Sequence, residues 1–317
     1  MTHLQTLIEA IIVLVILIGA VLWLRRRGVV NDGHRDLFNR LVTEFALPGL
    51  IIVNLAQPPG LGMRHLPGAG LMFLSILLVG GVAWAVGSLM RLSRPVLGAV
   101  VMVSAFGSSS TLGYAFVKQV FPDDPQALTD ALVIGEIGAI IPVFTVGVLA
   151  SSYFGGGDQL KAQGVSPTRA FFMSPMFIAL VIGLAISWSG LPTENWIGRV
   201  LTQPLQIAGD SLMILVAFSI GLMLRPVSVR LLLPLLLLVG CLKLILEPAA
   251  AGFVAGAFHL QEMERAVLVL EAAMPSGAIA AVVAARYGCD GAVASNLVIA
   301  TYVLSLVTIP LIFMLNF

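Results

Sequence analysis

The sequence carries very little charge. Asp, Glu, Lys and Arg make up only 10% of its 317 residues, whereas soluble proteins average about 25%. It has two cysteines and no CxxC or HExxH spacing, so neither a disulfide framework nor a zinc site is indicated. We therefore expect no metal and no cofactor, and the sequence has no signal for a nucleic-acid partner.

Histidine is also scarce, and its placement argues against hydrolytic chemistry. An intramembrane serine protease needs a general base near its nucleophile. Every histidine, however, falls at or near a predicted span end or in a loop: His3, His34, His65 and His259. A paired-aspartate protease needs a second aspartate at the depth of Asp210, and none is evident. We therefore do not expect an enzyme.

Apolar residues are what the chain has in abundance. They make up 59% of it, the mean hydropathy is +1.03, and apolar runs of about 20 residues, long enough to cross a membrane, recur throughout. Arg25-Arg26-Arg27 follows the first run as a stop-transfer pattern, so we expect this span to be retained. We predict an all-α polytopic membrane protein with ten transmembrane helices near 4–24, 37–57, 67–90, 96–120, 126–151, 170–189, 196–223, 231–257, 263–286 and 292–316.

The positive charges predict the orientation of these spans. Most of the 17 Lys and Arg residues fall in the loops after spans 1, 3, 5, 7 and 9 or at the adjoining helix ends. The positive-inside rule then places both termini outside and the glycine-rich loop at 155–167 in the cytoplasm. We expect a multi-pass protein of the cell (inner) membrane.

The loop at 155–167 reads as a linker between two halves of five spans, residues 1–154 and 168–317. An odd number of spans per half turns the second half upside down relative to the first, which gives a 5+5 inverted repeat. Polar landmarks support this pairing, because "LPG" at Leu47–Gly49 and "DSL" at Asp210–Leu212 fall at matching positions.

The fourth span of each half is interrupted by polar residues, glycine and proline. "SAFGSSSTLGYAFV" (Ser104–Val117) and "MPSG" (Met274–Gly277) occupy the matching place. In transporters built from inverted repeats, such helices cross near the bilayer midplane and form the substrate site. Close packing of helices through small residues is the alternative explanation for either stretch alone. The expected substrate-binding residues are Ser108, Ser109, Ser110, Thr111, Pro275, Ser276 and Gly277.

Four stretches resemble the auxin efflux carrier family, whose bacterial members include malonate and malate carriers. They are "LVTEFALPGLIIVNL" (Leu41–Leu55), "SAFGSSSTLGYAFV", "EAAMPSGAIAAVVAARYG" (Glu271–Gly288) and "LSLVTIPLIF" (Leu304–Phe313), which resemble the family's helices 2, 4, 9 and 10. The resemblance implies a scaffold of spans 1, 2, 6 and 7, a mobile transport domain of spans 3–5 and 8–10, crossing helices 4 and 9, and elevator-type transport. Bile-acid symporters and NhaA-type antiporters share this architecture.

The chain departs from the family pattern at the crossing helices. Ser108 stands where the family has Asn and Ala115 where it has Pro, and the usual Asn of helix 9 would fall near Ile279. The polar side chains that hold substrate in related carriers are therefore shortened or absent here.

Ionisable residues within spans need a reason, because each costs at least ~2.5–3.5 kcal/mol at mid-bilayer. Lys243 and Glu247 lie four apart on one helix face, where they can form a structural ion pair or serve the site. Glu271, one turn before Pro275, is a candidate coupling site for H⁺ or Na⁺. The remaining candidates are Asp210 and Glu136 for coupling, Lys243 as a counter-charge, and Asn54, which either faces the site from the scaffold or makes a helix–helix hydrogen bond.

We predict a secondary transporter that moves a small organic anion, a carboxylate, by elevator-type alternating access. The alternative is a sodium- or proton-coupled antiporter or bile-acid-type symporter on the same scaffold, with Glu271 and Asp210 as cation ligands. The inverted repeat argues against a channel or a receptor, because its usual consequence is two equivalent access states. Expected partners are the anion, H⁺ or Na⁺, membrane lipid and, as a candidate assembly, a homodimer.

Overall fold

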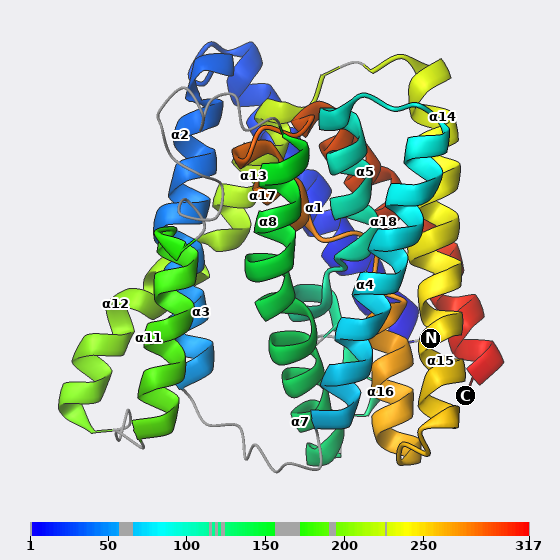
Figure 1. The fold of residues 1–317 in the computed structure, drawn as a ribbon. Helices are drawn as coiled ribbons and strands as arrows, with labels where there is room; N and C mark the ends of the chain where they lie inside the picture. The colour runs from blue at the N-terminus through cyan, green and yellow to red at the C-terminus, as the bar shows by residue number, and fades with distance from the viewer. Residues whose placement is uncertain are drawn as a thin grey trace.

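The computed structural model describes residues 2–56, 66–113, 116–117, 120–121, 124–155, 172–189, 195–225 and 227–316, and their regular structure is helical. Within these ranges, Arg94–Ala105 and Pro175–Ile186 are shorter apolar helices. Five helices are long and apolar enough to cross a membrane: Leu66–Leu89, Gln126–Phe154, Gly198–Met223, Val229–Ala257 and Gly291–Met314. This confirms the prediction of an all-helical polytopic membrane protein (Figure 1).

The described helical segments overlap the predicted spans, with π-helical turns (η) inside several of them. The first half contains α1 (Thr2–Arg26), α2 (Arg35–Arg40), η2 (Leu41–Ala46), α3 (Leu47–Ala56), α4 (Leu66–Leu89), α5 (Arg94–Ala105), η4 (Ser109–Gly113), α7 (Pro125–Val133), η5 (Ile134–Ile140), η6 (Val143–Gly147) and α8 (Val148–Phe154). The second contains α11 (Pro175–Ser189), α12 (Trp196–Asp210), α13 (Leu212–Met223), α14 (Val229–Cys241), η7 (Leu242–Leu246), α15 (Glu247–Ala257), α16 (Glu262–Ala272), α17 (Ala278–Arg286) and α18 (Gly291–Asn316). The predicted linker, beyond Gly155, lies outside the described residues.

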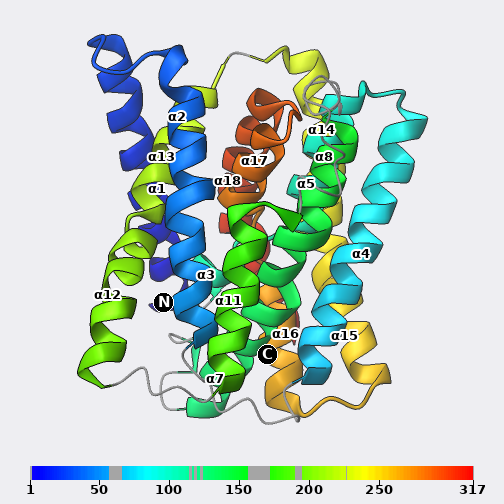
Figure 2. The same cartoon turned by 60° about the vertical axis from the view of Figure 1, so that its left-hand side comes forward.

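The helices pack in two groups (Figures 1 and 2). In the first group, α3 packs on α11 and α12, and α13 packs on α1 and α2. In the second, α4 packs on α5 and α15, α16 on α15 and α7, and α18 on α17, α14 and α5, while α8 packs on α5. The groups meet where α17 contacts α13 and α2, and where α18 contacts α1.

Apolar side chains cover both the inside and the outside of the bundle. Val100 of α5, Leu270 of α16 and Val282 of α17 are fully buried, so the core is centred on the second helix group. Trp84, by contrast, is 53% exposed and Phe253 79% exposed. Such large exposed apolar residues are unfavourable in water and are solvated by lipid in a membrane.

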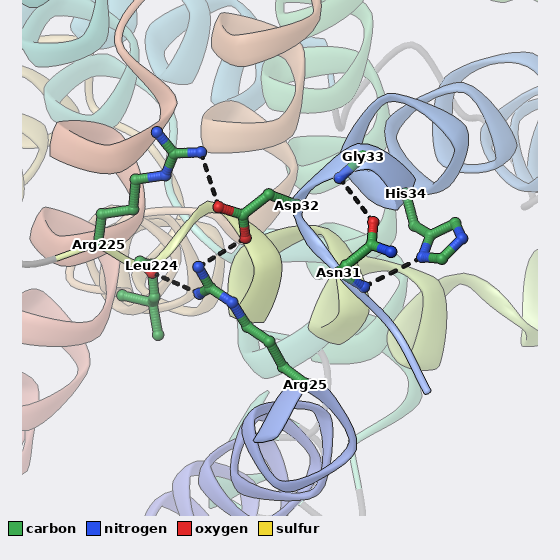
Figure 3. A network of polar contacts seen from close by, with 7 residues as sticks. All are labelled: Arg25, Asn31, Asp32, Gly33, His34, Leu224 and Arg225. Atoms are coloured by element: carbon green, nitrogen blue, oxygen red, sulfur yellow. Dashed lines mark hydrogen bonds and ion pairs between the residues drawn. The ribbon is translucent and has the colours of Figure 1, made fainter. Parts of the chain in front are cut away.

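A polar network ties the end of α1 to the connection between α13 and α14 (Figure 3). Asp32 accepts from Arg25 at 2.6 Å and from Arg225 at 3.0 Å, and Arg25 also donates to the carbonyl oxygen of Leu224 at 3.1 Å. Asn296 of α18 donates to the carbonyl oxygen of Arg225 at 3.1 Å. The connection that leads from the first helix group to the second is therefore anchored from both.

Candidate functional site

Two helices break at the centre of the second helix group. α5 ends at Ala105, and Phe106 turns into extended backbone with φ −113° and ψ 115° before the helix resumes as η4. α16 ends at Ala272, and α17 begins only after Gly277, which is also extended. Pro275 lies within this second break and has no N–H to continue a helical ladder.

The two broken segments cross and bond to each other. Gly107 and Ser276 form an antiparallel bridge. The Ser108 N–H donates to the Pro275 carbonyl and the Gly277 N–H to the Phe106 carbonyl, each at 2.8 Å. Each break therefore satisfies backbone groups that the other leaves unpaired, which is required where no water is available.

Glycine is needed at 277 because the backbones approach so closely, and at 107 a side chain would meet the buried Lys243 ammonium. A Cβ on Gly277 would lie 2.7 Å from the carbonyl oxygen of Gly107, and a Cβ on Gly107 would lie 2.7 Å from Nζ of Lys243. The two interrupted stretches singled out in the sequence thus meet at this crossing.

Two of the predicted substrate hydroxyls, those of Ser108 and Ser276, are engaged within the protein. The Ser276 hydroxyl donates to the carbonyl oxygen of Val103 at 2.6 Å. The Ser108 hydroxyl accepts from the Tyr302 hydroxyl at 3.0 Å. Both serines are buried. The side chains of Ser110, Thr111 and Asn54 lie outside what the structure describes.

A buried ion pair lies against the crossing. Lys243 of η7 and Glu247 of α15 are 2.5 Å apart and fully buried, which confirms that these two residues pair. Lys243 also donates to the carbonyl oxygen of Ala272, the last residue of α16, at 3.4 Å. Since helix C-termini carry partial negative charge, the ammonium is well placed to compensate the broken end of α16. Ser75 of α4 donates to Glu247 at 3.4 Å.

Glu271 of α16 lies beside this pair. Its side chain is fully buried, and neither carboxylate oxygen has a well-formed hydrogen bond to a described residue. The Ser109 hydroxyl lies next to it, and the charges of Lys243 and Glu136 act on it. Ser109, Glu136 and Lys243 all lie on π-helical segments, which are frequent at functional sites.

Asp210 does not join this cluster. It is exposed at the end of α12, and α12 packs on α3, η2 and α13 in the first helix group. The prediction that it lies mid-span is consistent with its position in the Gly198–Met223 helix. The structure therefore brings together Glu271, Lys243, Glu247 and Glu136, and leaves Asp210 apart.

Tyr302 of α18 is a residue of the crossing that the sequence interpretation missed. Its ring also lines a cavity of about 260 Å³ formed with Val15, Ile18, Gly19, Leu22, Leu224, Ile299 and Val303, between α1 and α18 where the helix groups meet. The sequence did contain a sign of its role. Tyrosine favours membrane interfaces, whereas this one lies in the interior of a 26-residue apolar helix. Tyr302 thus separates the apolar cavity from Ser108.

A family model described as a membrane transport protein matches residues 6–166 and 160–313. The chain belongs to this family of membrane transport proteins. The match confirms the predicted resemblance, since this is the auxin efflux carrier-like transport family.

Two relatives match along nearly their whole length. An uncharacterized transporter of Methanocaldococcus jannaschii is 22% identical over 308 residues, covering 96% of this chain and 96% of its own. An uncharacterized transporter of Methanothermobacter thermautotrophicus is 26% identical over 302 residues, covering 95% and 94%. The family member described here is therefore a transmembrane transport protein, as predicted.

Proposed function

We propose that this protein is a secondary transporter that carries a small organic anion, a carboxylate, across the cell membrane. The observation that supports this most is the crossing of two broken helices at Gly107 and Ser276. Unwound backbone is tolerated at membrane depth where it lines a site for a transported solute. The N-terminus of α17 lies at the crossing and favours an anion there, and the Lys243 ammonium, paired with Glu247, lies against Gly107.

The proposed movement is of elevator type. In this proposal the first helix group is the scaffold of spans 1, 2, 6 and 7, and the second is the transport domain of spans 3–5 and 8–10; the packing of the helices in two groups supports it. The order of segments in the two halves supports a 5+5 inverted repeat, because α5 with η4 and α16 with α17 are the interrupted pair in corresponding places. We propose the cell (inner) membrane as its location, with both termini outside and the linker at 155–167 in the cytoplasm.

Ligand-dependent thermal stability of the detergent-purified protein tests the proposal. A compound that binds the folded state raises the unfolding midpoint by mass action. The panel holds malonate, succinate, propionate, an indole carboxylate, a bile acid and sodium chloride against choline chloride. We expect a carboxylate to stabilise the protein and Ser109→Leu to abolish that shift. Stabilisation by none of the carboxylates would contradict the proposal.

The second candidate is a cation-coupled antiporter or bile-acid-type symporter on the same scaffold. The buried carboxylate of Glu271 favours it, because neither of its oxygens has a well-formed hydrogen bond to a described residue, and such a carboxylate suits a cation or proton. Stabilisation by sodium alone, lost in Glu271→Gln, would favour this candidate over the anion carrier.

A further inference from the structure

Several buried carboxylates surround one buried cation beside the crossing. Lys243 is paired with Glu247 and interacts electrostatically with Glu271. The charge of Glu136 also acts on Glu271. Glu136 lies on η5, which packs on α16, and is 8% exposed. The described parts of α4, η4 and α18 supply hydroxyls to this region and no charged residue. Negative charge therefore exceeds positive charge if every carboxyl group is ionised.

Glu271 is the carboxylate in this set whose negative charge has the fewest hydrogen-bond and ion-pair partners in the described part of the chain. Neither of its oxygens has a well-formed hydrogen bond to a described residue, and the adjacent Ser109 hydroxyl is the neighbour that interacts with the carboxylate. A Cβ on Gly113 would collide with the carboxylate, so the group packs directly against the η4 backbone. Burying an ionised carboxylate without a partner is strongly unfavourable, and such a group takes up a proton instead.

Lys243 is positioned between Glu247 and the backbone next to Glu271. Its Nζ atom is 2.5 Å from Glu247 and 3.4 Å from the carbonyl oxygen of Ala272, the residue that follows Glu271. A sodium ion at Glu271 would have to sit within the field of this ammonium and against the tightly packed Gly113. A proton needs no such space.

We propose that Glu271 binds a proton that moves together with the anion, and that Lys243 shifts to bridge Glu247 and Glu271 when this proton leaves. The inference rests on the proposed function and names its coupling ion and direction of coupling. In the step, the Glu271 carboxylic acid releases H⁺ to water and becomes a carboxylate, and no other covalent bond changes. The protonated cluster carries one negative charge fewer, so each of the anion and the proton binds more tightly when the other is bound. Carrying both across the membrane together is symport.

Infrared difference spectroscopy of the purified protein tests the proton site with the proton itself as probe. We expect a carboxylic-acid carbonyl band that disappears as pH rises and that is missing from Glu271→Gln. Glu262→Gln, an exposed carboxylate on the same helix, is the matched control and should keep the band. A band that titrates unchanged in Glu271→Gln, or no titrating band at all, would overturn the inference.

A second variant tests whether Lys243 can pair with Glu271. It also keeps the inference testable if Glu271→Gln fails to fold. Glu247→Gln removes the present partner of the ammonium, so Lys243 should pair with Glu271 and stabilise its ionised form. We expect the Glu271 band to titrate at lower pH in this variant. An unchanged midpoint would show that Lys243 does not reach Glu271. A shift of the band by sodium at constant pH would show that Na⁺, and not a proton, is the ion that binds at Glu271.

Coupling to the anion is tested with malonate, using thermal stability at several pH values. In the wild type we expect affinity to fall about tenfold per pH unit above the Glu271 midpoint, as for one linked proton. In Glu271→Gln it should stay within about twofold across the same range. A pH-independent wild-type affinity would refute symport. Titration of Glu271 without stabilisation by any carboxylate of the panel would instead refute the anion as cargo.

Discussion

Arg286 at the end of α17 donates to Glu44 of η2 at 2.7 Å, and this ion pair joins the two helix groups. α17 packs within the second group, and η2 leads into α3 in the first. The two side chains are 35% and 42% exposed, so water reaches them. If one group slides past the other during transport, this bond must break in every cycle.

Glu44→Gln is therefore expected to speed transport with little loss of stability. A partly exposed ion pair contributes about 0–1 kcal/mol, so the unfolding midpoint should change by only a few degrees. Removing up to that amount from the barrier corresponds to a roughly two- to fivefold higher initial rate of uptake into proteoliposomes. Asp36→Asn is the control, because it breaks the Arg35–Asp36 pair at 3.6 Å without touching the contact between groups. An equal acceleration in Asp36→Asn would contradict the view that the Arg286–Glu44 ion pair holds the two helix groups together.

Lys243→Met is expected to destabilise the protein strongly. It leaves Glu247 buried without its cation, and breaking a buried pair in this way costs about 3–5 kcal/mol. Lys243→Met combined with Glu247→Leu should recover most of that loss, because both charges are then gone. If the pair is only structural, the double variant will also transport normally. We expect it to be stable and inactive, as measured by thermal unfolding and uptake together.

Gly277→Ala is expected to disrupt the crossing. The added Cβ would lie 2.7 Å from the carbonyl oxygen of Gly107, which is backbone and cannot rotate away. Overpacking of this kind costs about 1–3 kcal/mol. Gly81→Ala in α4 is the matched control, because its Cβ meets no atom within 4 Å. Thermal unfolding should separate the two variants clearly, and equal midpoints would show that the crossing tolerates the extra atom.

Asp210→Asn distinguishes the two candidate functions. Asp210 is exposed on α12 and lies apart from the charge cluster, so the anion carrier with Glu271 as its proton site should keep its pH dependence in this variant. The cation-coupled alternative with Asp210 as a ligand predicts that coupling is lost. Uptake measured with and without a pH gradient, and with and without a sodium gradient, decides between these outcomes.

Much of this arrangement follows from local sequence rules, and the rest depends on long-range packing. Helix positions follow from the lengths of apolar runs, and the breaks from Gly107 and Pro275. The Lys243–Glu247 pair follows from a spacing of four residues. The Tyr302–Ser108 bond joins residues 194 positions apart, and the Ser276–Val103 bond joins residues 173 apart. No local pattern encodes such pairs, nor the exposed placement of Asp210.

Tyr302→Phe tests whether the hydroxyl bond to Ser108 closes the crossing. The ring stays in place against the apolar cavity, and only the 3.0 Å hydrogen bond to the Ser108 hydroxyl is lost. A buried hydrogen bond contributes about 0.5–1.5 kcal/mol, so the unfolding midpoint should fall slightly. Because the Ser108 hydroxyl is then no longer held by the Tyr302 hydroxyl, it can turn and donate its own proton to a carboxylate, and we expect malonate to bind several-fold more tightly.

A double-mutant cycle with Ser108→Ala isolates this bond from general effects of the tyrosine. The two single variants and the double variant should show a coupling energy of about 1 kcal/mol in thermal unfolding, as for residues in direct contact. Tyr153→Phe, an exposed tyrosine in α8, controls for the loss of a phenol elsewhere. Tighter malonate binding in Tyr302→Phe that persists in the double variant would mean that Ser108 does not hold the anion. Loss of the gain in the double variant would assign the anion contact to Ser108 and make Tyr302 the group that a substrate must displace.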